Sequence, residues 1–142
     1  MKSKNILIAC QDEYGIRPLS TLLHGIGYKI ETVKSVSETV RKVRKGDAHV
    51  LLLDDELEGL KAFDLVPLFK KINEKIQVIV ISPEVPLGLV KRLRGAGIFY
   101  HAMKPIDPEE ICSAVECAFE KIERESLQEG FLPFFIPRRV PA

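Results

Sequence analysis

Charged side chains stand directly after apolar runs at three separate places in this sequence. Asp54 follows one run, the acidic pair Asp12 and Glu13 follows another, and Lys104 comes at the end of a third. If each run is a strand of one parallel sheet, the residues just past the strands gather in a single crevice, which is where ligands bind in such folds. Two carboxylates and a lysine in that crevice would suit a divalent cation and a phosphoryl group.

The composition describes an ordinary single domain without a strong charge. The chain has 142 residues, with 21 Lys and Arg against 20 Asp and Glu, so no overall field attracts nucleic acid or anionic membranes. No run approaches 18 apolar residues, and the N-terminus does not read as a signal peptide. Three cysteines (Cys10, Cys112 and Cys117) lack metal-site spacing and are expected to be reduced thiols. We therefore expect a cytoplasmic protein.

Short apolar runs alternate with longer amphipathic segments along most of the chain. The expected strands are 5–10, 28–33, 49–53, 77–81 and 98–103, and the expected helices are 14–24, 36–45, 62–72, 86–96 and 108–124. Glycines and N-capping residues fall at the same breaks. This alternation predicts an α/β fold, a (βα)5 doubly wound five-stranded parallel sheet, within a domain that covers residues 1–125.

Residues 126–142 differ from the rest of the chain. This segment holds three of the seven Phe and three of the nine Pro, and the prolines predict that no regular helix runs through it. It is also far shorter than the roughly 50 residues of a small domain. We expect a Pro/Phe-rich C-terminal tail and no separate output domain.

The motifs together resemble the receiver domain of bacterial response regulators in two-component signalling, across roughly residues 4–123. That family has an acidic pair after its first strand, an aspartate after its third, a Ser or Thr at the end of its fourth, and Lys-Pro after its fifth. The corresponding residues here are Asp12, Asp54, Ser82 and Lys104-Pro105. The resemblance implies a flavodoxin-like receiver fold.

The resemblance also implies a role for each of these residues. Asp54 would be the phosphoacceptor, and Mg²⁺ would be held by Asp12, by Asp54 and by the backbone carbonyl of Glu56. Lys104 and Ser82 would stabilise the transferred phosphoryl group, as expected for a loose transition state with its charge on the phosphoryl oxygens. The protein would then be a signalling domain and not an enzyme with substrate turnover.

The sequence departs from the family pattern at several positions. Gln11 stands at the usual first acid, so it would bind the metal only weakly or through water. His101 stands where the family often has an aromatic switch residue, and we expect it to form the switch with Ser82. The Lys104–Pro105 peptide bond is expected to be cis, as in the family.

The implied partners are proteins. A histidine kinase or a phosphotransfer protein would supply the phosphoryl group, and an unknown downstream protein would receive the signal. A homodimer through the fourth helix, fifth strand and fifth helix is a further expectation. We expect no direct contact with nucleic acid or a membrane.

Three alternative functions remain open at this point. A pseudo-receiver would bind partners without phosphorylation. A phosphatase of the haloacid dehalogenase type would use a similar aspartate. Its motif requires two aspartates that are two residues apart, and this chain has Asp54 and Glu56 at those positions. A flavodoxin-like cofactor binder would need a phosphate-binding loop after the first strand, where this chain is acidic.

Overall fold

A five-stranded parallel sheet forms the centre of the protein. The computed structural model describes the backbone of residues 3–135 and the side chains of residues 3–127. The sheet has the order β2-β1-β3-β6-β7, with the strands β1 (Asn5–Ala9), β2 (Lys29–Val33), β3 (Val50–Asp54), β6 (Gln77–Ser82) and β7 (Tyr100–Met103). This confirms the predicted (βα)5 fold.

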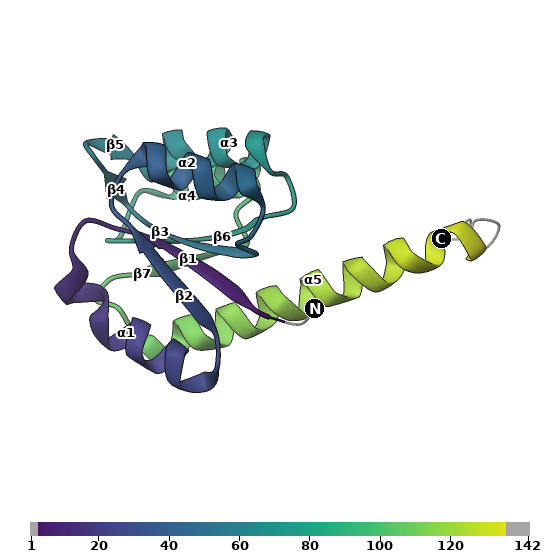
Figure 1. Ribbon diagram of the computed structural model, residues 1–142. Helices are drawn as coiled ribbons and strands as arrows, with labels where there is room; N and C mark the ends of the chain where they lie inside the picture. The colour runs from purple at the N-terminus through teal and green to yellow at the C-terminus, as the bar shows by residue number, and fades with distance from the viewer. Residues whose placement is uncertain (1–2, 136–142) are drawn as a thin grey trace.

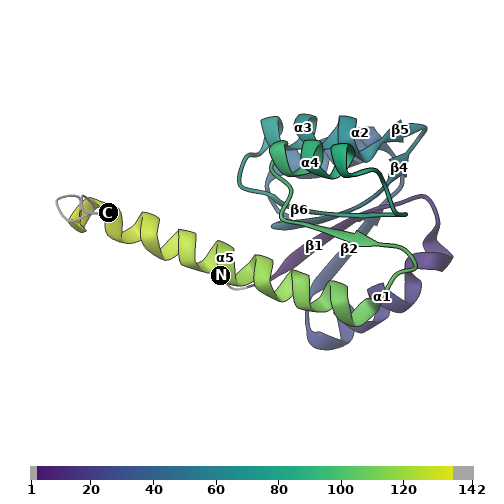
Figure 2. The ribbon, with the colours of Figure 1, turned by 180° about the vertical axis from the view of Figure 1, so that it is seen from behind.

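Helices cover both faces of this sheet. On one face lie α1 (Glu13–Ile26) and α5 (Pro108–Phe135), and on the other lie α2 (Val36–Lys45), α3 (Ala62–Ile72) and α4 (Leu87–Gly95), as Figures 1 and 2 show from opposite sides. The arrangement follows from right-handed crossovers between parallel strands. It leaves the carboxyl ends of all five strands at the same edge.

The two helical layers bury two separate hydrophobic cores, and the strand alternation explains the division. Ile6 and Ile8 of β1 pack into the core beneath α1 and α5, whereas Leu7 and Ala9 pack into the core beneath α2, α3 and α4. Successive side chains of a strand point to opposite faces. The central strands are apolar along their whole length because both faces are covered.

The fifth helix is longer than the sequence predicted. We expected it to end at residue 124 and the tail to be non-helical, but α5 continues to Phe135 and includes Pro133. A proline removes one backbone hydrogen bond from a helix and does not always end it, and α1 and α3 also contain an internal proline (Pro18 and Pro67). Figure 1 shows the distal part of α5 extending away from the sheet. Residues 136–142 of the expected tail lie outside the described residues.

A two-stranded hairpin follows β3 and was not predicted. It pairs β4 (Glu56–Leu57) with β5 (Leu60–Lys61) in antiparallel orientation. Its turn residues Glu58 and Gly59 have φ angles of 52° and 80°. Two positive φ angles in a row are typical of a type I′ turn, for which glycine at the second position is favourable.

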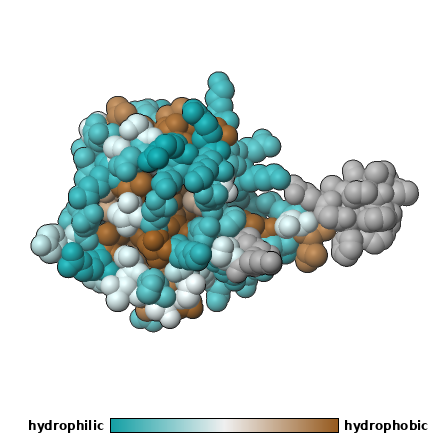
Figure 3. Space-filling model, viewed as in Figure 1, coloured by the Kyte–Doolittle hydropathy of each residue, from teal (hydrophilic) through white to brown (hydrophobic). Residues whose placement is uncertain are grey.

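The surface around this fold is mostly polar. Figure 3 shows hydrophilic side chains over most of one face, with hydrophobic side chains gathered towards its middle. The edge strand β2 carries the exposed charged residues Lys29 and Glu31, which discourage pairing with another strand. Among the described residues, no helix is long and apolar enough to cross a membrane.

Candidate functional site

The register of the sheet brings the predicted site residues to one edge. Asp54 is the last residue of β3, and it pairs with Ile81 of β6, so Ser82 comes next along that strand. Ser82 pairs in turn with Met103 of β7, and Lys104 N donates to the Ser82 carbonyl oxygen at 2.8 Å. The ends of three adjacent strands therefore place Asp54, Ser82 and Lys104 side by side.

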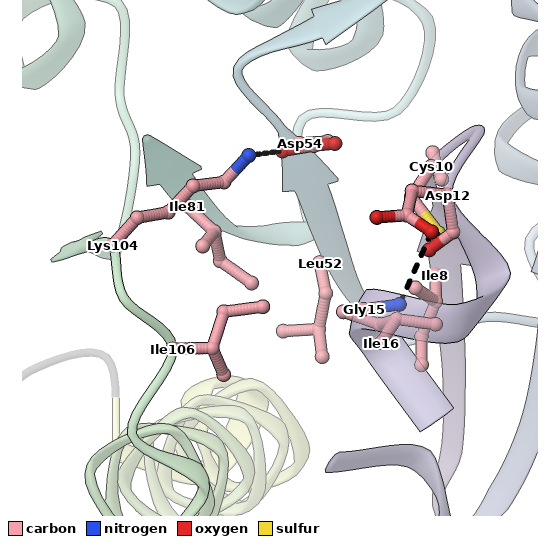
Figure 4. Close-up of a pocket in the computed structure, with 11 residues that line it drawn as sticks. Ile8, Cys10, Asp12, Gly15, Ile16, Leu52, Asp54, Ile81, Lys104 and Ile106 are labelled. Atoms are coloured by element: carbon pink, nitrogen blue, oxygen red, sulfur yellow. Dashed lines mark hydrogen bonds and ion pairs between the residues drawn. The ribbon is translucent and has the colours of Figure 1, made fainter. Parts of the chain in front are cut away.

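Lys104 lies between two carboxylates. Its Nζ is 2.8 Å from Oδ1 of Asp54 and 3.0 Å from Oδ1 of Asp55, and the backbone N–H of Asp55 also donates to Oδ1 of Asp54 at 2.9 Å. One oxygen of Asp54 is thus occupied by two donors. The other oxygen points towards Asp12 across the pocket, as the close-up in Figure 4 shows.

Burial and the shared lysine act on this triad in opposite directions. Burial raises the pKa of the Asp54 carboxyl, and the hydrogen bond from Lys104 only partly offsets it. Burial also raises the pKa of Asp55, but its hydrogen bonds with Lys104 and Asp54 lower it by more, so the pKa falls below its ordinary value. Burial lowers the pKa of Lys104, yet the two carboxylates raise it overall. The lysine stays charged at neutral pH.

Asp12 faces the same pocket from the start of α1. Its Oδ1 accepts a hydrogen bond from the N–H of Gly15 at 3.1 Å and so caps the helix. A side chain at position 15 would meet this carboxylate, because an added Cβ would lie 2.8 Å from Asp12 Oδ2. Asp12, Asp54 and Lys104 line a cavity of about 70 Å³ together with apolar side chains, which is room for several water molecules.

The residue level with Asp54 on the neighbouring strand is a cysteine. Ala9 of β1 pairs with Leu53, so Cys10 lies beside Asp54, and Cys10 also lines the cavity. Burial and the nearby carboxylates of Asp54 and Asp12 raise the pKa of the Cys10 thiol to about 11. The thiol is therefore protonated at neutral pH and adds no charge. Sequence reasoning did not assign Cys10 to the site, although its position at the strand end was a usable signal.

These donors fit a small hard cation. Two carboxylates and bound water are a common way to hold Mg²⁺ in proteins, and Asp12 and Asp54 face one cavity of suitable size. Among the described residues, no three His, Cys, Asp or Glu side chains form a metal-binding cluster. A cation here would consequently need backbone oxygen and water as well.

Gln11 is hydrogen-bonded to the hairpin. Its side-chain oxygen accepts a hydrogen bond from the backbone N–H of Glu58 at 3.0 Å. The carboxylate of Glu58 in turn accepts from the N–H of Val36, at the start of α2, at 2.7 Å. Gln11 therefore joins the loop after β1 to the β4–β5 hairpin, a connection that the sequence pattern did not reveal.

Ser82 and His101 are in direct contact. Ser82 Oγ and His101 Nε2 are 2.6 Å apart, and the Ser82 hydroxyl donates to the carbonyl oxygen of Pro83 at 2.9 Å. A hydroxyl has one proton, so that bond leaves His101 Nε2 as the donor to Ser82. Burial and then Arg94 lower the pKa of His101. The Lys104–Pro105 peptide bond beside this pair is cis.

Comparison with known proteins identifies a matching family. The model of the response regulator receiver domain family matches residues 6–116. The chain is 29% identical over 117 residues to the sporulation initiation phosphotransferase F of Bacillus subtilis (strain 168), a match that covers 82% of this chain and 94% of that protein.

Another curated relative is much longer than this chain. The chain is 28% identical over 116 residues to the DNA-binding transcriptional regulator NtrC of Bradyrhizobium sp. (strain RP501 Parasponia). The match covers 81% of this chain but only 24% of the regulator. The chain thus spans about a quarter of that protein.

A solved structure shares the fold. A CheY-like response regulator receiver domain protein from Methanospirillum hungatei JF-1 superimposes with a TM-score of 0.80 at 21% identity, covering 87% of this chain and 99% of that one. At this identity the likeness concerns the fold alone.

Proposed function

Because this chain belongs to the response regulator receiver domain family, we propose that it is a phosphoacceptor that takes a phosphoryl group onto Asp54. The observation that carries the proposal is the position of Asp54 at the end of β3, with one oxygen bound to Lys104 at 2.8 Å and the other facing the cavity. The oxygen that faces the cavity is the nucleophile. Carboxylates form covalent phosphoryl intermediates of this kind.

Each neighbouring residue has a defined part in the transfer. Lys104 holds a positive charge beside the developing charge on the phosphoryl oxygens. Ser82, at the end of the adjacent strand, supplies a hydroxyl donor after it leaves the carbonyl oxygen of Pro83. The carboxylates Asp12 and Asp54 and the backbone carbonyl of Glu56 would hold Mg²⁺, which screens the repulsion between the phosphoryl group and the carboxylates.

The proposed partners follow from the reaction. The donor is a phosphohistidine on a histidine kinase or a phosphotransfer protein, and the signal passes by contact to a downstream protein. A homodimer through α4, β7 and α5 would use the edge of the sheet at β7, where Tyr100 and His101 line one surface pocket. The hydroxyl of Tyr100 donates to Glu110 of α5 at 2.6 Å, so this edge already couples strand and helix.

Mass measurement tests the proposal. The protein is incubated with acetyl phosphate and Mg²⁺ and weighed intact, and a gain of one phosphoryl group is expected. Asp54→Asn should abolish that gain, whereas Asp47→Asn, at the opposite edge of the sheet, should not. No gain with any donor or divalent cation would contradict the proposal, and rapid multiple turnover of the donor would favour a phosphatase instead.

One observation favours a second candidate, a pseudo-receiver that binds partners without phosphorylation. Cys10 brings a neutral thiol to the place beside Asp54, so the β1 side of the site supplies the Asp12 carboxylate alone among the residues that line the cavity. If partner binding persists in Asp54→Asn and no phosphoryl group is ever gained, this second candidate is the correct one.

A further inference from the structure

Asp55 contacts the site lysine from outside the cavity. Asp54 and Lys104 both line the cavity, but Asp55 does not. Asp55 nevertheless lies 3.0 Å from the Lys104 ammonium, almost as close as Asp54 at 2.8 Å. The ammonium has three N–H donors, and two of them point to carboxylates that stand next to each other in the sequence.

The backbone fixes Asp55 in this position. Its N–H donates to Oδ1 of Asp54 at 2.9 Å, and its carbonyl oxygen accepts from the N–H of Ala62 at 2.8 Å, where the β4–β5 hairpin meets α3. With both backbone groups bonded, the Asp55 side chain has a short and defined reach to Lys104. The contact is therefore built into the loop between β3 and α3.

Phosphorylation changes the balance between the two carboxylates. When the cavity-facing oxygen of Asp54 attacks the phosphorus of acetyl phosphate, the bond from phosphorus to the acetyl oxygen breaks and acetate leaves with the electron pair. Asp54 Oδ1 then becomes an uncharged carbonyl oxygen. Lys104 is left with two charged acceptors, the new phosphoryl group and the Asp55 carboxylate, and the two acceptors also repel each other.

We propose that Asp55 is a positioning residue that restrains Lys104 and so slows the phosphorylation of Asp54. It holds the ammonium at the mouth of the site before transfer and competes with the phosphoryl group for it during transfer. The inference rests on the proposed function of Asp54. It adds an internal competitor for which the family motif gives no role.

The rate of phosphorylation by acetyl phosphate tests this role. Asp55→Asn keeps the size of the side chain and removes its charge. We expect the rate of phosphorylation to rise roughly threefold to fivefold, which corresponds to the free energy of one ion pair near the surface. Asp55→Glu should restore a slow rate because it restores the carboxylate. Glu84→Gln removes one exposed negative charge after β6 and measures the general effect of charge.

A double-mutant cycle separates the lysine contact from simple repulsion. With Lys104→Ala, Asp55→Asn should raise the residual rate by no more than the Glu84→Gln control does. An equal or lower rate in Asp55→Asn, or the same increase with and without Lys104, would overturn the inference while leaving Asp54 as the phosphoacceptor.

The exchange of the Lys104 ammonium protons tests the contact with Asp55 without a phosphoryl donor. In the ¹⁵N-labelled protein, two hydrogen bonds should slow the exchange of the Lys104 ammonium protons, and Asp55→Asn should speed it. If no variant is phosphorylated, the proposed function fails, and the inference fails with it even if this exchange effect is present. If phosphorylation occurs but the exchange does not change, only the role of Asp55 is lost.

Discussion

The two sides of the site edge differ in charge and in how closely they follow the family pattern. On the side of β3, β6 and β7, Lys104 bonds the carboxylates of Asp54 and Asp55. The hydroxyl of Ser82, at the end of the adjacent strand, is bonded to Pro83 and His101. On the side of β1, the residue beside Asp54 is the protonated thiol of Cys10, and Gln11 bonds the hairpin. The residues that we propose for phosphoryl binding therefore all match the family pattern, whereas the residues that we propose for cation binding match it only in part.

This difference indicates that the two tasks of the site can vary separately. In the proposed function, phosphoryl binding would depend on a strand-end lysine whose position is set by the ladder between β6 and β7. Cation binding would depend on the loop between β1 and α1, which carries Asp12. Substitutions on each side should therefore change different measured quantities.

The largest effect on the phosphorylation rate is expected from Lys104, on the side of β3, β6 and β7. Lys104→Ala removes the positive charge next to the phosphoryl group, and the rate of Asp54 phosphorylation by acetyl phosphate should fall by about 100-fold, as for the loss of one preorganised donor. Lys45→Ala is the control, because that lysine pairs with Asp47 at the opposite edge of the sheet. A loss of less than threefold would remove Lys104 from the transfer.

The next largest effect is expected on the side of β1. Cys10→Asp places a third carboxylate beside Asp54, so the affinity for Mg²⁺, measured by titration calorimetry, should rise by about tenfold. Without Mg²⁺ the same change should lower the free energy of unfolding by roughly 1–3 kcal/mol, because like charges are crowded in a buried place.

Cys10→Asn is the matched control for that change. It has the shape of Asp without the charge, and it should show neither the gain in affinity nor any dependence of stability on Mg²⁺ beyond that of the unchanged protein. If Asp and Asn at position 10 bind Mg²⁺ equally, the β1 side does not limit cation binding.

Particular residues show how far the sequence could predict this arrangement. The strands, their order along the chain and the gathering of Asp54, Asp12 and Lys104 followed from apolar periodicity, because a parallel sheet brings strand ends to one edge. Ser82 was assigned only through the resemblance to the family. Cys10 was missed because the register between β1 and β3, and not the sequence spacing, decides which residue lies beside Asp54.

The loops and the last helix were harder to predict. The bond between Gln11 and Glu58 joins residues 47 positions apart, and no local pattern encodes it. The Glu58-Gly59 pair was a visible turn signal for the hairpin, but strands of two residues are too short for periodicity. The prolines after residue 125 gave the wrong end for α5, since a single proline costs a helix one bond and some added strain.

A smaller effect tests the hairpin that joins the two sides. Glu58→Ala removes the carboxylate that accepts the N–H of Val36 at the start of α2, and the free energy of unfolding should fall by about 1 kcal/mol, as for the loss of a helix cap. The melting temperature should fall by about 3–5 °C. Glu58→Gln retains an oxygen acceptor and should lose less than half as much. Equal losses would show that the charge matters and not the hydrogen bond.

The smallest expected effect concerns pH and His101. Burial, and then the charge of Arg94, lower the pKa of His101 in the folded protein, with Glu110 opposing them. The folded state therefore binds fewer protons than the unfolded state. This contribution to stability is fully present above the ordinary pKa of about 6.5 and is lost as pH falls through the lower folded value.

His101→Gln removes this titration and keeps an N–H donor for Ser82. Melting temperatures measured from pH 8 to pH 5 should fall less steeply in the variant than in the unchanged protein. His49, whose pKa burial also lowers, is present in both proteins, so the difference between their profiles isolates His101. Parallel profiles would mean that folding does not change the proton affinity of His101, and the contact with Ser82 would then carry no pH dependence.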